Sequence, residues 1–303
     1  MLNRLAFFRE RGWVEISAAD YAEIWQRYGG SVLTHPEFVA RLSMLAGIPP
    51  RYLGWRRDET FGAALPVWGR HLALSGAALK ARGKKRIFDL GSAEVILPVC
   101  GAARDIPLRH SISWLSGQHE NVFSGLAAQK ERLALLKPPE RFSAKFCYNQ
   151  RRALKQFENA GGTARPLADF SPDERAAMYL DLFSRRWGFP AAGAARMAEA
   201  FSLLSDWMTG SVLFLAGAPV AVQILYRVES PRWISVEYIN GGVAPEARDF
   251  SVGSVLIYLN TEAARQEASA KGKTLRYSFG RMDAGYKALW CRAEPVFRAG
   301  SAW

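Results

Sequence analysis

Cysteine and histidine are both scarce in this chain of 303 residues, which has 3 cysteines and 4 histidines. The cysteines are odd in number and show no CxxC spacing, so the sequence offers no disulfide framework and is typical of a reducing compartment. The histidines show no HxH or HExxH spacing and no arrangement with cysteine that would suit a metal. We therefore expect no metal site.

Long apolar runs are also missing. The longest apolar stretch, 212–228, is interrupted by Gly217, Pro219 and Gln223. A membrane-spanning helix needs about 20 consecutive apolar residues, so this stretch instead predicts two strands around a turn. The first residues have charges on both sides of a short apolar run and lack the core of a secretory signal. We expect a cytoplasmic protein.

Positive charge is what the chain has in excess, with a formal net charge of +12 and a pI near 9.8. Segment 130–165 contains 9 Lys or Arg and 3 Glu, so it carries +6, half of the total. Such a balance favours anionic partners, namely nucleic acid, anionic lipid or a phosphate-bearing cofactor. A basic solvated surface explains the same numbers equally well.

The length and the order of the predicted elements indicate two domains of about 150 residues each. We predict a mixed α/β protein with two domains, 1–137 and 138–303, the second opening with a basic helix over 143–159. Both halves run helix, helix, strand hairpin, strands, helix. In the first half the expected elements are helices over 17–28 and from 36 to about 45, strands within 51–72, near 86–90 and over 93–99, and a long helix over 111–136. In the second half they are helices over 172–187, 193–208 and 252–270, and strands over 212–215, 220–228, 233–239, 274–280 and near 293–297.

The strongest local signal is the run Arg-Asp-Phe-Ser-Val-Gly-Ser over 248–254, which follows a predicted strand and opens an amphipathic helix. The first N–H groups of a helix have no partner within it, so they bind phosphate readily. Gly253 allows a close backbone approach, and Ser251 could cap the helix or donate to an oxygen. An ordinary serine-capped helix is the simpler alternative.

This order of strand, R-x-x-S-x-G, helix and strand resembles the GNAT acyltransferase fold, whose cofactor loop follows R/Q-x-x-G-x-G/A. The outer positions match, and Ser251 replaces the first glycine. The resemblance implies tandem GNAT-like domains, each a central mixed sheet flanked by helices, and a donor that is acyl-CoA or aminoacyl-tRNA. The residues that would hold the donor are Arg248, Ser251, Val252, Gly253 and Ser254. RRALKQFENAGG, LFSRRWG and SFGRMDAGYKALW also resemble acetyltransferases of polysaccharide biosynthesis and the two-copy GNAT ligases that add amino acids to peptidoglycan.

Four motifs in the same order resemble a bacterial family induced inside macrophages: GGSVLTHPEFV (29–39), NQRRALKQFENAGG (149–162), NGGVAPEARDFSVGSVL (240–256) and YKALWC (286–291). Members of that family support resistance to cationic antimicrobial peptides such as polymyxin. The resemblance implies a peripheral position on the cytoplasmic face of the inner membrane. It implies a biological role more directly than a reaction.

Candidate catalytic residues lie near the end of the predicted strand and in the last motif. Glu237 could act as general base towards an amine or hydroxyl nucleophile, or it could be a solvent-facing strand residue. On strict alternation, Tyr238 and Asn240 share the opposite face. Tyr286 could act as general acid, or it could pack on Trp290 four residues later.

Three residues are candidates for binding the substrate, and each has a structural alternative. Asn240 follows the strand, Lys287 could neutralise an anionic group, and Asp283 could hold an amine or only begin a turn. His35 stands before a proline and a helix, where a cap or a packed side chain is the simpler explanation than proton transfer. The exposed basic residues of 143–159, Arg151, Arg152 and Lys155, could touch lipid headgroups or a tRNA donor, or only face solvent.

Three functions follow, and the residues alone leave them open. The first is acyl or aminoacyl transfer to a cell-envelope precursor, with an anionic membrane surface as partner and no sequence-specific nucleic acid, although tRNA could deliver the donor. The second is a non-catalytic module of GNAT shape that binds the membrane or a peptide. The third is a nucleic-acid binder, for which no recognisable motif is present.

Overall fold

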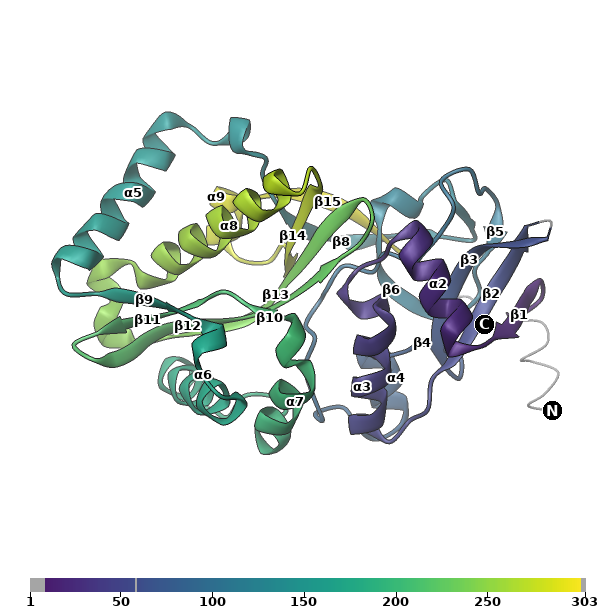
Figure 1. Ribbon diagram of the computed structural model, residues 1–303, viewed down its shortest axis with the longest axis horizontal. Coiled ribbons are helices and arrows are strands. Elements are labelled where there is room, and N and C mark those ends of the chain that lie inside the picture. The colour runs from purple at the N-terminus through teal and green to yellow at the C-terminus, as the bar shows by residue number, and fades with distance from the viewer. Residues whose placement is uncertain (1–8, 58, 301–303) are drawn as a thin grey trace.

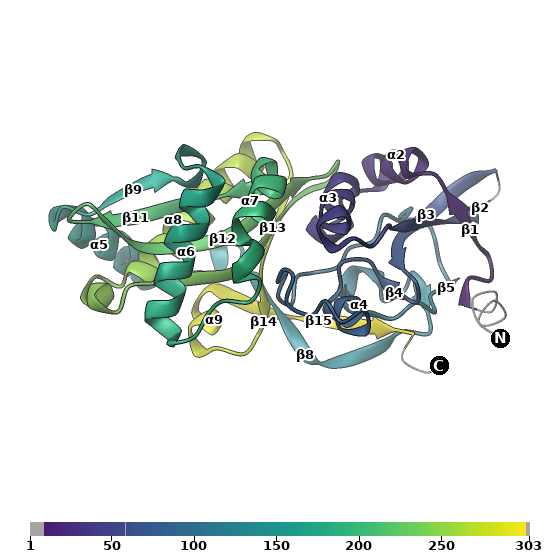
Figure 2. The same cartoon turned by 90° about the horizontal axis from the view of Figure 1, so that it is seen from below.

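The computed structural model describes residues 9–57 and 59–300. Two lobes lie side by side along the longest axis, the first built from the earlier part of the chain and the second from the later part (Figure 1). The last strand runs from the second lobe back to the first (Figures 1 and 2).

The first lobe combines the helices α2, α3 and α4 with a small sheet whose strands pair in the order β1-β2-β3-β4, all antiparallel. A short parallel pair, β5 with β7, lies outside this sheet. The elements are β1 (Trp13–Ile16), α2 (Ala18–Tyr28), α3 (Pro36–Ala46), β2 (Arg51–Arg57), β3 (Thr60–Trp68), β4 (His71–Leu72), α4 (Gly76–Ala81), β5 (Ile106–Pro107) and β7 (Phe123–Ser124).

The second lobe is built on a nine-stranded sheet with the order β6-β15-β8-β14-β13-β12-β11-β9, with β10 also pairing with β12. Only β13 and β14 pair in parallel, so the sheet is mixed. Its strands are β6 (Ile112–Ser116), β8 (Ala127–Leu136), β9 (Thr163–Pro166), β10 (Met208–Thr209), β11 (Ser211–Leu215), β12 (Ala218–Glu229), β13 (Trp233–Val243), β14 (Thr274–Arg281) and β15 (Cys291–Ala299). Its helices are α5 (Ala144–Asn159), α6 (Pro172–Trp187), α7 (Met197–Leu204), α8 (Val252–Ala270) and α9 (Gly285–Trp290).

Most predicted elements of the second half are confirmed, including the hairpin of β11 and β12 and the full length of α8. Local signals explain this accuracy. Helix α6 begins with a reciprocal cap between Ser171 and Glu174 and ends at Gly188 in the left-handed conformation. His35 accepts the backbone N–H of Phe38 at 3.4 Å, so it caps α3, which is the simpler of its two interpretations.

The predicted helix over 111–136 is wrong, because this segment forms β6 and β8. Strand β8 lies between β14 and β15 and pairs with both. The residues of 127–132 alternate between half-buried and exposed, and 133–136 are all buried. Residues such as Glu131, Lys130 and Leu133 favour helices, but two flanking strands supply partners for the backbone, and tertiary context overrides propensity.

Two further predictions are also corrected. No strand forms over 86–90, and 93–99 contributes only isolated bridges at Val95 and Val99. The helix predicted over 193–208 is limited to α7, which has a 3-10 turn at each end. Gly193 begins this region in the left-handed conformation, which delays the start of the helix.

The two lobes meet where α3 packs against α7 (Figure 2). Arg41 of α3 donates to the carbonyl of Leu203 and to Asp206, both at 2.9 Å, and stacks over Trp207. The boundary after residue 137 remains a prediction. Strands β6 and β8, which precede it, belong to the nine-stranded sheet, so segments on both sides of 137 build the second lobe.

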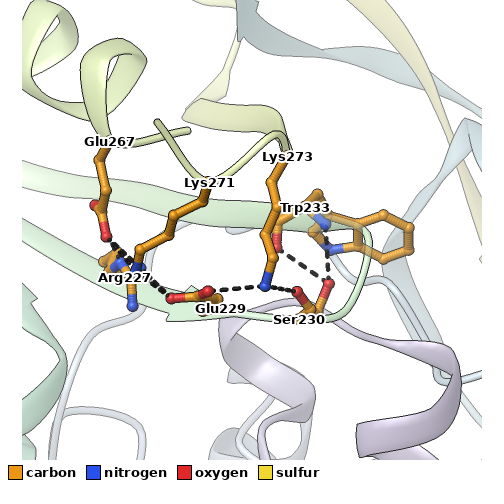
Figure 3. Close-up of polar contacts among 7 residues, drawn as sticks. All are labelled: Arg227, Glu229, Ser230, Trp233, Glu267, Lys271 and Lys273. Atoms are coloured by element: carbon orange, nitrogen blue, oxygen red, sulfur yellow. Dashed lines mark hydrogen bonds and ion pairs between the residues drawn. The ribbon is translucent and has the colours of Figure 1, made fainter. Parts of the chain in front are cut away.

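A charged cluster joins the end of β12 to the end of α8 (Figure 3). Glu229 lies 2.5 Å from Lys271 and 2.7 Å from Lys273, and it also pairs with Arg227. Glu267 completes the cluster by pairing with Arg227 and Lys271. Hydrogen bonds from Lys271, then Lys273 and Arg227, lower the pKa of Glu229 below its usual 4.5.

Glu229→Gln should lower the free energy of unfolding by about 1 kcal/mol at pH 7, because three cations lose their shared partner. Since folding depresses the pKa of Glu229, its contribution is complete above pH 4.5 and is lost as the pH falls below that value. Urea unfolding at pH 7 and pH 3 measures this. Glu23→Gln, which removes a single exposed pair with Arg27, is the control and should change stability by no more than about 0.5 kcal/mol. An equal effect of Glu229→Gln at both pH values would contradict the electrostatic account.

Candidate functional site

The candidate site lies where β13 and β14 separate. The two strands pair in parallel as far as Glu237 and Ser278, and β13 then continues to Val243. Helix α8 lies on one face of this part of the sheet, and α6 and α7 lie on the other (Figure 1). A pocket of about 390 Å³ opens on the α8 side. We call it the α8 pocket.

The lining of the α8 pocket comes from β12, β13, the start of α8, α9 and the end of α6. The lining residues are Arg186, Val222, Gln223, Tyr238, Val243, Pro245, Arg248, Ser251, Val252, Gly253, Ser254, Leu256, Ile257 and Tyr286. All five residues predicted to hold the donor, and also Tyr286, are among them. The sequence motif and the pocket therefore coincide in space.

The start of α8 leaves backbone N–H groups available to the pocket. Ser251 stands before the helix with φ 50°, in the left-handed conformation, and its side chain makes no capping hydrogen bond. The N–H groups of Ser254 and Val255 both bond to the Ser251 carbonyl, which leaves those of Val252 and Gly253, at the first two helical positions, for an acceptor. A Cβ added to Gly253 would meet nothing nearer than Val243 Cγ2 at 3.6 Å, so the cradle is open.

Ser251→Gly should raise the free energy of unfolding by about 0.5–1 kcal/mol, because glycine adopts the left-handed conformation without the steric cost that serine bears. Thermal or urea unfolding measures the change. Ser254→Gly is the matched control, since this residue lies within α8, where glycine costs about 0.5 kcal/mol more than serine. If Ser251→Gly instead lowers the free energy of unfolding, the contacts of the serine side chain stabilise the fold by more than its left-handed backbone conformation costs.

The charge of the α8 pocket suits an anion. Arg186 and Arg248 line it, and none of the described lining residues is acidic. Arg248 is exposed, and Arg186 stacks over Trp187 at 4.7 Å. Gln223, which lines the pocket, accepts a buried hydrogen bond at 2.7 Å from Asn260 of α8, and this bond orients its side-chain amide. These residues fit a pyrophosphate or another phosphate-bearing donor.

Two tyrosines form the inner wall of the α8 pocket. Tyr286 of α9 is 39% exposed, and partial burial followed by the neighbouring Tyr238 raises the pKa of its hydroxyl above the usual 10.0. Burial also raises the pKa of Tyr238, while Arg186 opposes this shift. Both hydroxyls are therefore protonated at neutral pH. Tyr286 remains a candidate proton donor.

Glu237 lies on the other face of β13, away from the α8 pocket. It is fully buried, its Oε1 accepts the N–H of Glu94 at 3.1 Å, and its Oε2 has no partner within the described chain. Burial and the charge of Glu94, which is paired with Arg276, raise the pKa of Glu237 well above 4.5. The carboxyl does not reach the pocket in which a donor would lie.

The alternation assumed for the end of β13 is wrong, because the strand contains a β-bulge. Asn240 pairs with Ile224, but Tyr238 pairs with Leu225, so Ile239 is the extra residue. A bulge reverses the faces of the residues that follow it. Tyr238 consequently lines the α8 pocket, whereas Asn240 lines a separate hollow on the α6 and α7 side.

The other two candidates for substrate binding pair with each other instead of lining the α8 pocket. Lys287 Nζ lies 2.9 Å from Asp283 Oδ1 and donates to the carbonyl of Arg281 at 2.6 Å. Lys287 is buried, and the spacing of four residues brings its partner onto the same turn. Arg151, Arg152 and Lys155 lie exposed on α5.

Sequence reasoning missed Gln223 and Tyr238 as pocket residues. One signal was available for Gln223, a polar residue inside the apolar run Val220–Leu225 of β12. The bulge that directs Tyr238 into the pocket leaves no comparable sequence mark. Within 9–57 and 59–300, no three His, Cys, Asp or Glu side chains lie close enough to hold a metal ion.

Comparison with known proteins identifies the family. The family model described as Mig-14 matches residues 35–299. The chain belongs to the Mig-14 family. This confirms the resemblance carried by the four sequence motifs. No curated protein matches the chain.

Several solved structures are similar to this Mig-14 family member over nearly its whole length. The structure of FemX is 11% identical with a TM-score of 0.56, covering 94% of this chain and 96% of its own. The C-terminal domain of an Agrobacterium fabrum protein described as a lysylphosphatidylglycerol synthetase is 14% identical with a TM-score of 0.52, covering 94% and 93%. A tandem GNAT protein from the clavulanic acid biosynthesis pathway is 11% identical with a TM-score of 0.43, covering 94% and 97%.

The predicted class, mixed α/β with tandem GNAT-like halves, is confirmed. Each half of this Mig-14 family member begins with a strand, two helices and a hairpin. The order is β1-α2-α3-β2-β3 in the first half and β9-α6-α7-β11-β12 in the second, where the short strand β10 comes before β11. Within residues 9–57 and 59–300, the separated strands and α8, which form the α8 pocket, belong to the second half. None of the helices in the described ranges is both long and apolar enough to cross a membrane.

Proposed function

We propose that this chain is an acyl- or aminoacyltransferase that modifies a cell-envelope component and thereby supports resistance to cationic antimicrobial peptides. The observation that carries the proposal is the α8 pocket itself. It combines free N–H groups at the start of α8, two arginines and a protonated tyrosine in one cavity without acidic lining. Membership of the Mig-14 family and the GNAT-like fold support the same function.

In this proposal, the donor supplies an activated acyl carbon, as the thioester of acyl-CoA or the ester of aminoacyl-tRNA. The N–H groups of Val252 and Gly253, with Arg248, hold its phosphates. Tyr286 donates a proton to the leaving sulfur or oxygen as the bond to the acyl carbon breaks. The acceptor nucleophile forms the new bond to that carbon and loses its own proton to solvent, from which the Tyr286 phenolate regains the proton that it donated.

Titration calorimetry of the full chain with acyl-CoA and, separately, with aminoacyl-tRNA tests this function. Binding of either donor, with displacement by the corresponding product, supports it. Absence of measurable binding by both donors at millimolar acyl-CoA and micromolar tRNA would refute it. The two arms also decide which donor class the pocket serves.

We further propose that the protein works at the cytoplasmic face of the inner membrane, bound to its anionic surface. Exposed apolar side chains lie beside pocket residues, with Trp187 following Arg186 and Leu289 on the same short helix as Tyr286. Phe189 is 55% exposed, and its ring centroid lies 6.5 Å from that of Trp187. Aromatic residues beside arginine suit a lipid–water interface.

Full-length protein should sediment with vesicles that contain anionic lipid and remain in solution with neutral vesicles. Replacing Trp187 and Phe189 together by Ala should lower the bound fraction at least several-fold, because two interfacial rings are removed. Salt should weaken binding, since the arginine contribution is screened. Equal binding of the double variant and the parent would show that another surface makes the contact.

A non-catalytic module that binds the membrane or a peptide is the second candidate. The α8 pocket has no carboxylate or imidazole among its described lining residues to accept a proton, and this favours the second candidate. Direct binding of a cationic peptide is opposed by the net charge of +12. Donor binding without any turnover over a broad range of acceptors would favour this candidate over the transferase.

A further inference from the structure

Another pocket lies where the turn between β12 and β13 meets the first lobe. Its lining comes from the end of α2, from segments 96–104 and 118–122, and from residues 232–233 of the turn. Its volume is about 220 Å³. A site needs roughly 10–15 Å³ to hold one water molecule, so this pocket has room for a compact organic group. We call it the Arg232 pocket.

Two arginines from different lobes meet in the Arg232 pocket. A Cβ added to Gly101 would lie 3.7 Å from both Nη1 and Nη2 of Arg232, so this guanidinium group lies over Gly101. Arg104 Nη1 donates to the carbonyl of Gly101 at 2.9 Å and to that of Ala103 at 2.6 Å. Both guanidinium groups therefore lie beside the same residue, and both side chains are exposed.

No carboxylate balances the charges of these two arginines. None of the described lining residues of the Arg232 pocket is acidic. Within residues 9–57 and 59–300, neither Arg104 nor Arg232 is in an ion pair, and the Arg232 guanidinium group has no hydrogen-bond partner. Two like charges at one place repel each other, and an anion between them would offset this cost. The planar fork of a guanidinium group matches the oxygens of a phosphate.

His119 adds a buried hydrogen-bond donor to the lining of the pocket. Its side chain is buried, and its Nε2 accepts the backbone N–H of Leu97 at 3.0 Å. Burial, followed by the charge of Arg276, lowers the pKa of His119 to about 3, so the ring is neutral and Nδ1 carries its one proton. Nδ1 has no hydrogen-bond partner within the described chain. Buried polar groups without a partner are rare, so this donor is a second indication of a bound acceptor.

Two aromatic side chains give the Arg232 pocket an apolar wall. Trp233 Nε1 donates to the carbonyl of Gly30 at 2.9 Å, and the Tyr28 hydroxyl donates to the carbonyl of Phe61 at 3.1 Å. These bonds hold both rings in place. A ligand that carries a ring next to its anionic group would contact the aromatic wall and the two guanidinium groups together.

The backbone that carries Arg232 is fixed by hydrogen bonds. The N–H of Ser230 donates to the carbonyl of Trp233 at 2.9 Å, and the N–H of Trp233 donates to Ser230 Oγ at 3.2 Å (Figure 3). Lys273 Nζ donates to the carbonyl of Ser230 at 2.8 Å, and the carbonyl of Arg232 accepts the N–H of Thr274 at 3.2 Å. The turn therefore holds Arg232 at the pocket before any ligand binds.

We propose that the Arg232 pocket binds a small soluble aromatic phosphate ester. Its phosphate group lies between Arg104 and Arg232, with His119 as a further donor, and its ring lies against Trp233. The site does not depend on the transferase function proposed above, because it shares no described lining residue with the α8 pocket. Since the two arginines belong to different lobes, the bound ligand links the lobes.

Ligand-observed NMR with the full chain at pH 7 tests this, with phenyl phosphate as the probe and phenol as the matched probe without the phosphate. All samples carry Gly253→Trp, whose added side chain occupies the α8 pocket, so that binding there does not contribute. Phenyl phosphate should bind, and phenol should not bind at the same concentration. Adding Arg232→Gln should weaken phenyl phosphate binding at least tenfold. Adding Arg298→Gln, which removes an exposed arginine of β15 outside the pocket lining, should leave it unchanged.

Arg232→Lys and thermal unfolding add two further readouts. Arg232→Lys keeps the charge without the fork, so it should bind phenyl phosphate more tightly than Arg232→Gln and more weakly than arginine. Phenyl phosphate should raise the thermal unfolding midpoint, because a ligand of the folded state stabilises it, and Arg232→Gln should abolish this rise. Equal binding of phenyl phosphate and phenol, or unchanged binding by Arg232→Gln, would overturn the proposal.

Inorganic phosphate and lipid vesicles separate the possible sources of the phosphate group. Inorganic phosphate should bind at least several-fold more weakly than phenyl phosphate, because it has no ring to contact Trp233. Arg232→Gln should sediment with vesicles of anionic lipid as the parent does. If inorganic phosphate binds as tightly as phenyl phosphate, the aromatic class of ligand is wrong. If Arg232→Gln loses vesicle binding, the phosphate belongs to a lipid headgroup and the soluble ligand is wrong.

Discussion

Gly253→Trp should reduce the affinity for the donor, acyl-CoA or aminoacyl-tRNA, by about 100-fold or more while leaving the fold intact. A Cβ at this position meets nothing closer than 3.6 Å, so a large side chain has room to project into the α8 pocket. There it would occupy the space in front of the Val252 and Gly253 N–H groups. Loss of two hydrogen bonds to a charged phosphate, at about 1.5–3 kcal/mol each, accounts for an effect of this size.

Calorimetric titration of parent and variant measures the change, and the thermal unfolding midpoint shows whether the fold is retained. Gly76→Trp is the matched control, because it adds the same side chain at an open helical position of the first lobe, where nothing lies within 4 Å of an added Cβ. The control should bind the donor as the parent does. Full affinity in Gly253→Trp would mean that the start of α8 is not the donor site.

The part of the site that sequence predicted is the part with a local signature. Glycine and serine at the start of an amphipathic helix follow directly from how a helix begins, so the run 248–254 and helix α8 could both be read from spacing. Ser251 shows a limit of this approach. Serine at this place suggests a side-chain cap, whereas its left-handed backbone directs the side chain elsewhere.

The wrong predictions have a different origin, because the structure of these segments depends on contacts with segments that are distant in the sequence. Strand β8 was predicted as helix since its residues favour helices, and only β14 and β15, far along the chain, make it a strand. The bulge at Ile239 is set by pairing with β12, and it moved Asn240 to the face opposite Tyr238.

Glu237 illustrates the same point for chemistry. A strand glutamate beside a predicted cofactor loop is a reasonable candidate base, but the first lobe covers it with Glu94 and buries its carboxyl completely. A base should have a pKa near the working pH and reach its substrate. Burial raises the pKa of Glu237 well above 4.5 and also removes it from the α8 pocket.

Tyr286→Phe should lower the turnover rate by about 100-fold or more and leave donor affinity within about twofold, because proton donation to the leaving atom is a transition-state contribution. Release of free thiol from acyl-CoA, with a primary amine as acceptor, measures turnover, and calorimetry measures binding. Tyr258→Phe, on the part of α8 that faces a different cavity near Trp290, is the matched control. It should keep the parent rate.

The pH profile separates proton donation from a packing role. Because burial raises the pKa of Tyr286 above 10.0, the hydroxyl stays protonated from pH 6 to pH 9. The parent should therefore show no loss of rate in this range from ionisation of the donor, and any rise with pH should reflect deprotonation of the acceptor amine. The Tyr286→Phe variant should turn over donors with a less basic leaving group faster than donors with a more basic one, because a less basic leaving group needs less help from a proton donor. If the variant slows good and poor leaving groups equally, Tyr286 only packs beside Tyr238, and the proton must come from elsewhere.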